Sequence, residues 1–158
     1  METLNTILSE RTLFNGLKPE FINWLCGCAT EVKFEAQQCI FKMGESAEQF
    51  YLIRSGKIAV QVYAPPKGAL NIMTLNSNDV LGWSWLHLPY TYHFEAKAMT
   101  DVVAFAFDAV KVRNKCNEDH EFGFNFLNCF SQIMLQRLVA TRLQLLDIFG
   151  PDTPSTLL

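Results

Sequence analysis

The stretch Leu81-Gly82-Trp83-Ser84-Trp85-Leu86 joins two predicted strands. Gly82 has no Cβ and therefore allows a tight backbone turn at the end of the first strand. The residues after such a glycine can open a short helix whose free N–H groups suit an anion. The alternative is that the tryptophans plug the mouth of a β-barrel, because aromatic side chains usually serve packing. The sequence around the turn bears on this choice.

Apolar and polar residues alternate with a period of two on both sides of this turn, over residues 31–108. Ile58, Val60 and Val62, for example, are separated by single residues, as expected for a half-buried strand. Stretches rich in turn-forming residues separate the runs, at residues 42–45, 54–57, 65–68 and 76–79. Many short strands at near-regular spacing predict a barrel or a double-stranded sandwich.

Helical periodicity flanks this β segment at both ends. Residues 3–28 place apolar side chains at helical spacing, and residues 118–149 predict one long helix or two helices with a break near Gly123. Gly150 and Pro151 are expected to end the helix. We therefore expect a single domain over residues 1–158: N-terminal helices, a jelly-roll-like β-roll (a double-stranded β-helix) over residues 31–108, and a long C-terminal helical segment.

The second half of the long helix carries a seam with alternating spacings of four and three residues. Its members are Met134, Leu138, Thr141, Leu145 and Ile148. This spacing is typical of a coiled coil and predicts a parallel homodimer through the helix. The alternative is that the seam packs onto the chain's own barrel.

The composition predicts a globular cytoplasmic protein. Hydrophobic residues make up 49% of the 158 residues and charged residues 18%, and no apolar run approaches the ~18 residues of a membrane span. The N-terminus lacks the basic start and apolar run of a secretory signal, and the odd count of five cysteines favours reduced thiols. Cys26 and Cys28 lack the spacing of common zinc or redox sites. The net charge of −3 argues against nucleic acid as a direct partner.

Three ordered motifs add a family resemblance. The first motif is a hairpin, formed by Phe41-Lys42-Met43-Gly44-Glu45 and Phe50-Tyr51-Leu52-Ile53-Arg54-Ser55-Gly56-Lys57-Ile58. The second is Asp79-Val80-Leu81-Gly82, and the third is Ala96-Lys97-Ala98-Met99-Thr100-Asp101-Val102. This set, with its flanking helices, resembles the cyclic-nucleotide-binding domain of the catabolite activator protein (Crp/Fnr-like) superfamily over residues 10–149. The resemblance implies a regulatory β-roll whose phosphate-binding cassette begins at Gly82.

The cassette departs from the family's pattern at both specific anchors. In the family, a Glu after the glycine takes the ribose hydroxyl, and a later Arg, followed by Ser or Thr, pairs with the cyclic phosphate. Here Trp83 stands at the Glu position, Tyr92 at the Arg position and His93 at the Ser/Thr position. The resemblance places the candidate ligand pocket at Gly82, Trp83, Ser84, Trp85, Leu86, Tyr92, His93 and Thr141. A neutral phenol offers one donor and an indole accepts no hydrogen bond, so we expect cyclic AMP and cyclic GMP to bind very weakly or not at all.

No catalytic or metal-binding motif accompanies this pocket. Cupin enzymes with a similar β-roll bind a metal through a His-x-His pair and a carboxylate, whereas His93 and Glu95 offer only two ligands here. The sequence also lacks a nucleophile elbow, a P-loop and a dinucleotide fingerprint. We therefore expect a protein that is not an enzyme, with no metal and no resident cofactor.

Three functions fit these observations. The leading interpretation is a stand-alone, non-catalytic regulatory or sensor domain; the nine residues after Phe149 are too few for a helix-turn-helix, so no direct DNA binding is expected. The second is a protein-interaction module whose pocket is filled by its own aromatics. The third is a binder of a different small aromatic or anionic ligand, with Trp83, Trp85, Tyr90 and Tyr92 stacking on a flat ring.

Overall fold

The fold is known from a computed structural model that describes residues 2–10 and 13–149. Its helical elements are α1 (Leu4–Glu10), the 3₁₀ turn η1 (Leu13–Gly16), α2 (Pro19–Gly27), the 3₁₀ turn η2 (Ser84–Leu86), α3 (Ala109–Glu118) and α4 (His120–Phe149). Its strands are β1 (Ala29–Phe34), β2 (Cys39–Phe41), β3 (Gln49–Ser55), β4 (Ile58–Tyr63), β5 (Ala69–Leu75), β6 (Val80–Leu81), β7 (Glu95–Ala98) and β8 (Val102–Asp108).

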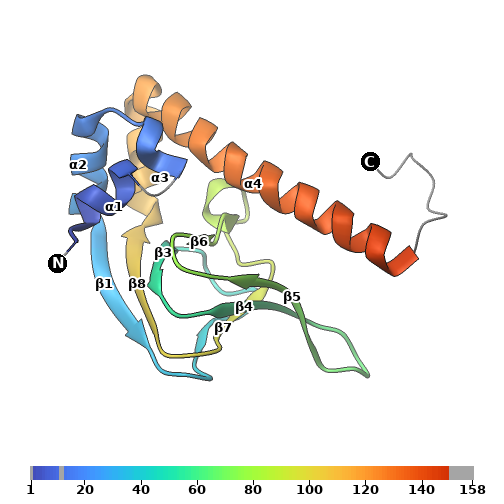
Figure 1. Cartoon of the computed structure of the whole chain (residues 1–158). Helices are drawn as coiled ribbons and strands as arrows, with labels where there is room; N and C mark the ends of the chain where they lie inside the picture. The colour runs from blue at the N-terminus through green and yellow to red at the C-terminus, as the bar shows by residue number, and fades with distance from the viewer. Residues whose placement is uncertain (1, 11–12, 150–158) are drawn as a thin grey trace.

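Two antiparallel four-stranded sheets form the roll, in the strand orders β1-β8-β3-β6 and β2-β7-β4-β5. β8 lies between β1 and β3, so both of its hydrogen-bonding edges are paired, and most of its side chains are buried, as its continuous apolar sequence predicts. Figure 1 shows the N-terminal helices and α3 gathered at one end of the roll, while α4 runs past it. The predicted fold class, a β-roll with N-terminal helices and a long C-terminal helix, is confirmed.

An aromatic cluster joins the roll, the turn and α4. The Trp85 ring, in η2, stacks on Phe50 of β3 at a centroid distance of 5.2 Å and an interplanar angle of 21°. The same indole meets Phe130 of α4 edge-on at 5.3 Å, and Phe126 lies at 5.9 Å. Packing against α4 explains why a residue of a surface turn is only 1% exposed.

A helix that the sequence analysis did not predict, α3, precedes the long C-terminal helix. The Asp108 carboxylate accepts a hydrogen bond from the Lys111 amide at 3.0 Å and caps α3, which the sequence analysis did not identify. Of the two alternatives predicted for residues 118–149, the structure has one long helix, α4, with no break near Gly123. The two helices separate at Asp119, whose carboxylate accepts from the Phe122 amide at 3.0 Å and starts α4.

Of the remaining predictions about the helices, one concerns residues that the structure describes and one concerns residues outside that range. The helices expected over residues 3–28 are α1, η1 and α2. The helix end predicted at Gly150 and Pro151 lies outside the described residues. Among the helices that the structure describes, none is both long and apolar enough to cross a membrane.

Gly123 is the position that allows α3 and α4 to pack closely. A Cβ placed on Gly123 would lie 2.6 Å from the Cys116 carbonyl oxygen, which is backbone and cannot rotate away.

We expect Gly123→Ala to destabilise the fold by about 1–3 kcal/mol, as overpacking does. Urea denaturation followed by tryptophan fluorescence measures the change. Gly27→Ala is the matched control, because no atom lies within 4 Å of a Cβ there. It should leave stability within about 1 kcal/mol of the wild type or raise it; equal losses in both variants would contradict the packing argument.

Candidate functional site: the cassette turn and its cavities

The cassette turn begins where β6 ends. Gly82 adopts φ +93°, a left-handed conformation that side chains disfavour, so the glycine is required by the backbone here. The turn that follows, η2, is a single 3₁₀ turn of three residues, in which the Leu86 amide donates to the Trp83 carbonyl at 3.0 Å. So short a turn aligns few peptide dipoles, so the anion site expected after Gly82 is not built by a helix here.

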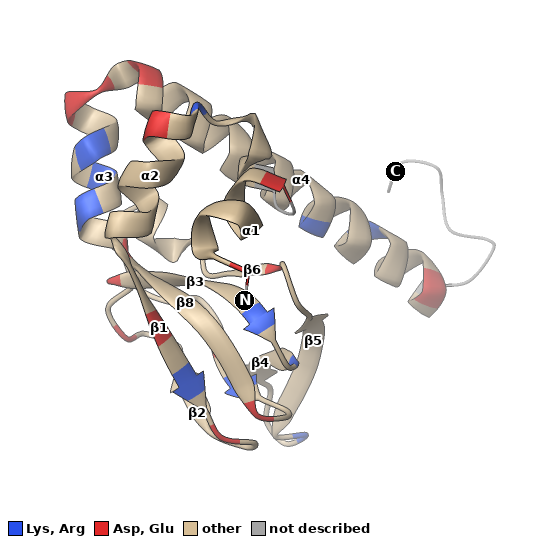
Figure 2. Cartoon of the chain, turned by 60° about the vertical axis from the view of Figure 1, so that its left-hand side comes forward, with Lys and Arg blue, Asp and Glu red and all other residues tan. Residues whose placement is uncertain are grey.

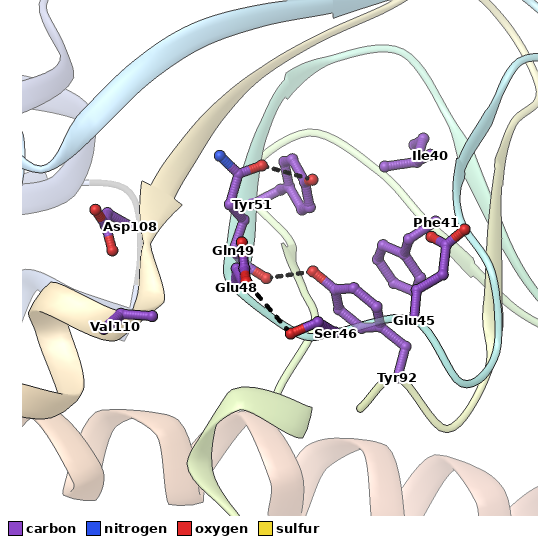
Figure 3. A pocket seen from close by; sticks show the side chains of 10 residues that line it. All are labelled: Ile40, Phe41, Glu45, Ser46, Glu48, Gln49, Tyr51, Tyr92, Asp108 and Val110. Atoms are coloured by element: carbon purple, nitrogen blue, oxygen red, sulfur yellow. Dashed lines mark hydrogen bonds between the residues drawn. The ribbon is translucent and has the colours of Figure 1, made fainter. Parts of the chain in front are cut away.

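Tyr92, which the resemblance places at the position of the family's arginine, makes contacts of its own within the core. Its ring stacks on Phe41 at a centroid distance of 3.6 Å and an angle of 7°, and its hydroxyl donates to the Gln49 carbonyl at 2.6 Å. Figure 3 shows this hydrogen bond beside the side chains of Phe41 and Glu45. Burial, with a further contribution from neighbouring Tyr51, raises the pKa of Tyr92 well above its ordinary range. The side chain is therefore a neutral part of the core, only 6% exposed.

The space left beside the cassette is small. The cavity there has a volume of about 30 Å³. It is lined by Phe41, Val60, Leu81, Gly82, Trp83, Ser84, Tyr92, His93, Phe94 and Arg137. Such a volume accommodates ordered water and is far smaller than a nucleotide. The cavity thus brings together five of the predicted residues (Gly82, Trp83, Ser84, Tyr92 and His93) around a small space.

Ser84 and His93 contact each other across this turn. The Ser84 hydroxyl lies 3.0 Å from Nδ1 of His93, which satisfies a hydroxyl that is otherwise buried. His93 itself is exposed. Within residues 2–10 and 13–149, no cluster of three or more His, Cys, Asp or Glu side chains could hold a metal ion.

Arg137 of α4 also contacts the turn, and the sequence analysis did not identify it as a candidate site residue. Its guanidinium carbon lies 4.8 Å from the centre of the Trp83 ring, and its Nη2 donates to the Val80 carbonyl. Burial lowers the pKa of Arg137 to about 10, partly opposed by the charge of Asp79. The sequence signal that could have identified Arg137 is a basic side chain next to Leu138, a member of the apolar seam.

Arg113 of α3 holds the far end of the same turn. Its Nη1 donates to the Trp85 carbonyl at 2.8 Å, and its guanidinium lies 3.8 Å from the centre of the Tyr90 ring. The two C-terminal helices therefore each place one arginine on the cassette turn.

A larger cavity opens between the roll and α4. Its volume is about 570 Å³, within the usual range for small-molecule sites. It is lined by Val60, Ile72, Met73, Trp83, Phe94, Met134, Arg137, Leu138, Thr141 and Gln144. Thr141 therefore meets Trp83 here, although its hydroxyl donates to the Arg137 carbonyl of its own helix at 2.8 Å.

Two candidate residues lie elsewhere. Trp85 is buried against Phe50 and α4, and Leu86 packs half-buried against the same core. Neither lines the small or the large cavity. The indole of Trp85 is therefore not available to stack on a ligand, because the core already covers it.

A third hollow lies behind Tyr92 and is acidic. Glu45, Glu48 and Asp108 line this groove, as Figure 3 shows. Phe41 and Tyr92 line both the groove and the small cavity, so their stacked rings form the wall between the two. Three carboxylates make the groove unfavourable for a phosphate.

Comparisons with known proteins agree with this architecture. Residues 31–119 match the family model described as "Cyclic nucleotide-binding domain". A "CRP-like cAMP-activated global transcriptional regulator" of Mycobacterium tuberculosis is 26% identical over 152 residues, which cover 96% of this chain and 66% of that protein. The chain thus spans slightly less than two thirds of that relative.

Solved structures show the same fold at low sequence identity. A putative cyclic nucleotide-binding protein from Geobacter metallireducens has a TM-score of 0.77 and 20% identity, over 87% of this chain and 99% of that one. A cyclic nucleotide-binding domain from Methylobacillus flagellatus has a TM-score of 0.76 and 16% identity, over 96% and 83% of the two chains.

The hydroxyl of Tyr92 generates a prediction of stability and its pH dependence. Tyr92→Phe should lower the free energy of unfolding at pH 7 by about 0.5–1.5 kcal/mol, because the Gln49 carbonyl loses its donor. The raised pKa means that the folded protein holds the phenol proton more tightly than the unfolded chain does. The wild type should therefore lose stability as the pH rises above ~10, the ordinary tyrosine value, and its advantage over Tyr92→Phe should shrink there.

Urea denaturation at several pH values between 7 and 11 measures this difference. Tyr63→Phe is the control, because Tyr63 is exposed at the end of β4 and should not change stability at pH 7. A wild-type advantage over Tyr92→Phe that stays constant or grows up to pH 11 would contradict the buried, neutral phenol.

Proposed function

The chain belongs to the cyclic nucleotide-binding domain family, and we propose that it is a non-catalytic regulatory domain that does not hold cyclic AMP or cyclic GMP through the family's usual contacts. The observation that carries this proposal is the position of Tyr92. Its ring fills the space beside the cassette, and its hydroxyl is already bound to the Gln49 carbonyl. A cyclic phosphate would have to displace a core side chain and would gain no cation at that position.

The binding free energy that the two missing contacts would supply also points to weak nucleotide binding. An arginine-phosphate pair and a ribose hydrogen bond contribute together about 3–6 kcal/mol, at roughly 1.5–3 kcal/mol for each interaction with a charged group. Trp83 and Tyr92 replace neither of them. At ~1.4 kcal/mol per decade, a micromolar site weakens to the millimolar range or beyond.

The self-filled phosphate position also favours the second function, a protein-interaction module that binds no small molecule. The open cavity of about 570 Å³ beside α4 favours ligand-dependent regulation instead. Binding of any small molecule in that cavity would decide for regulation by a ligand.

Calorimetric titration of the protein with cyclic AMP and with cyclic GMP tests the proposal. We expect dissociation constants of about 1 mM or weaker for both. The double variant Trp83→Glu with Tyr92→Arg restores the family's two side chains and should bind cyclic AMP more tightly, provided that its thermal melting shows a folded protein. Micromolar binding of either nucleotide by the wild type would overturn the proposal.

We also propose that α4 mediates a parallel homodimer. The predicted seam Met134, Leu138, Thr141, Leu145 and Ile148 continues toward the helix start through Ser131, Leu127 and Phe124 with the same spacing. Phe124 is 73% exposed and Ile148 74%, so the seam is apolar and uncovered at both ends of the helix. Most of the α4 ribbon is tan in Figure 2, because the helix carries only four charged residues, Glu121, Arg137, Arg142 and Asp147. A second copy of the same helix would bury this seam.

Replacement of two seam residues tests the dimer. Leu138→Glu with Leu145→Glu should convert a dimer into a monomer at ~100 μM, a concentration at which dimers of micromolar affinity persist. Light scattering coupled to gel filtration measures the mass. The control is Gln136→Glu with Leu143→Glu, since these positions lie on the helix side away from the seam. A monomeric wild type, or a dimer that survives both double substitutions, would refute the proposal.

A further inference from the structure

The cavity between the roll and α4 combines an apolar wall with one cation. Val60, Ile72 and Met73 line it from β4 and β5, and Met134 and Leu138 line it from α4. Trp83 and Phe94 add two aromatic rings. Arg137 is the only charged residue among those that line it. A ligand that fits this cavity has an apolar, flat body and few polar groups.

Arg137 lacks a carboxylate partner within the described part of the chain. Asp79 is near enough to act on its pKa, but the two side chains form no ion pair. Instead, the Asp79 carboxylate accepts from the Asn76 amide at 2.8 Å. A desolvated guanidinium without an anion is unfavourable, and burial indeed lowers the pKa of this group. An anion in the cavity would compensate the charge.

The guanidinium is also oriented and has donors to spare. Its contact with the Trp83 ring and its hydrogen bond to the Val80 carbonyl hold it at the edge of the cavity. A guanidinium has five N–H donors in a rigid fork that matches a carboxylate. The hydrogen bond to Val80 is the one bond that the structure records for it among the described residues. The remaining donors can hold a carboxylate in a bidentate pair.

We propose that this cavity binds a small aromatic carboxylate, whose ring packs between Trp83, Phe94 and the apolar face of α4 and whose carboxylate pairs with Arg137. The anion contact thereby comes from α4 rather than from the strand that precedes β7, where Tyr92 closes the family's phosphate position. This inference rests on the proposed function, a regulatory domain without the usual nucleotide contacts.

The location of the cavity gives such a ligand a regulatory effect. Met134, Leu138 and Thr141 line the cavity and also belong to the seam of the proposed dimer. A ligand that packs on these side chains would change the surface that α4 presents to a second copy. Its carboxylate would hold Arg137, which is already bonded to the strand that enters the cassette.

Two probes of nearly equal shape test the charge requirement. 1-Naphthylacetate carries a carboxylate, and 1-naphthylacetamide replaces it with a neutral amide. Calorimetric titration should give at least tenfold tighter binding for the acid. Arg137→Gln should weaken the acid at least tenfold and change the amide less than twofold. Arg142→Gln, the same substitution on the same helix but outside the cavity lining, should change neither.

A second variant keeps the test valid if Arg137→Gln does not fold. Ile72→Trp fills the cavity from β5 and leaves Arg137 in place, so it should abolish binding of both probes. The inference is overturned if the acid binds no better than the amide, if Arg137→Gln weakens both equally, or if Ile72→Trp leaves binding intact. Failure with the naphthyl probes while cyclic AMP also fails to bind overturns this inference alone. Micromolar binding of cyclic AMP overturns the proposed function instead.

Discussion

The stacking of Trp85 between the roll and α4 is the contact on which the rest of the structure depends. The indole joins Phe50 of β3 to Phe126 and Phe130 of α4, and Phe14 of η1 stacks on Phe126 from the other side. Each large side chain buried in this way contributes about 1.5–3 kcal/mol. The cassette turn, the N-terminal helices and α4 are thus parts of one hydrophobic core rather than separate layers.

The polar contacts of the turn reinforce the same connection. Arg113 and Arg137 reach the turn from α3 and α4 and bond to the carbonyls of Trp85 and Val80. The Trp85 Nε1, by contrast, is buried with no hydrogen-bond partner among the described residues, which is unfavourable by about 1–3 kcal/mol. The turn is therefore held by two arginine hydrogen bonds to its backbone and by the packing of its indole, not by a hydrogen bond of the indole itself.

The cavities show how this fold keeps its strands and helices while the space between them is distributed differently. The stacked rings of Tyr92 and Phe41 close the phosphate position, whereas the space beside α4 stays open. The positive charge correspondingly belongs to Arg137 of α4 and no longer to the cassette's exit. Membership of the family therefore fixes the layout of strands and helices, while the side chains in the cavities decide what can bind.

The β-roll, the turn at Gly82, the flanking helices and the apolar seam could be predicted from the sequence, because periodicity and turn chemistry are local properties of the chain. It also identified Trp83 and Tyr92 as departures at the two anchor positions. Three features became apparent only in the folded molecule: α3 begins at Ala109, Trp85 belongs to the core, and Arg137 lines a cavity. Arg137 bonds to Val80, a residue 57 positions away. Burial and partnership of a side chain arise from segments that meet only in the folded molecule, so no local pattern encodes them.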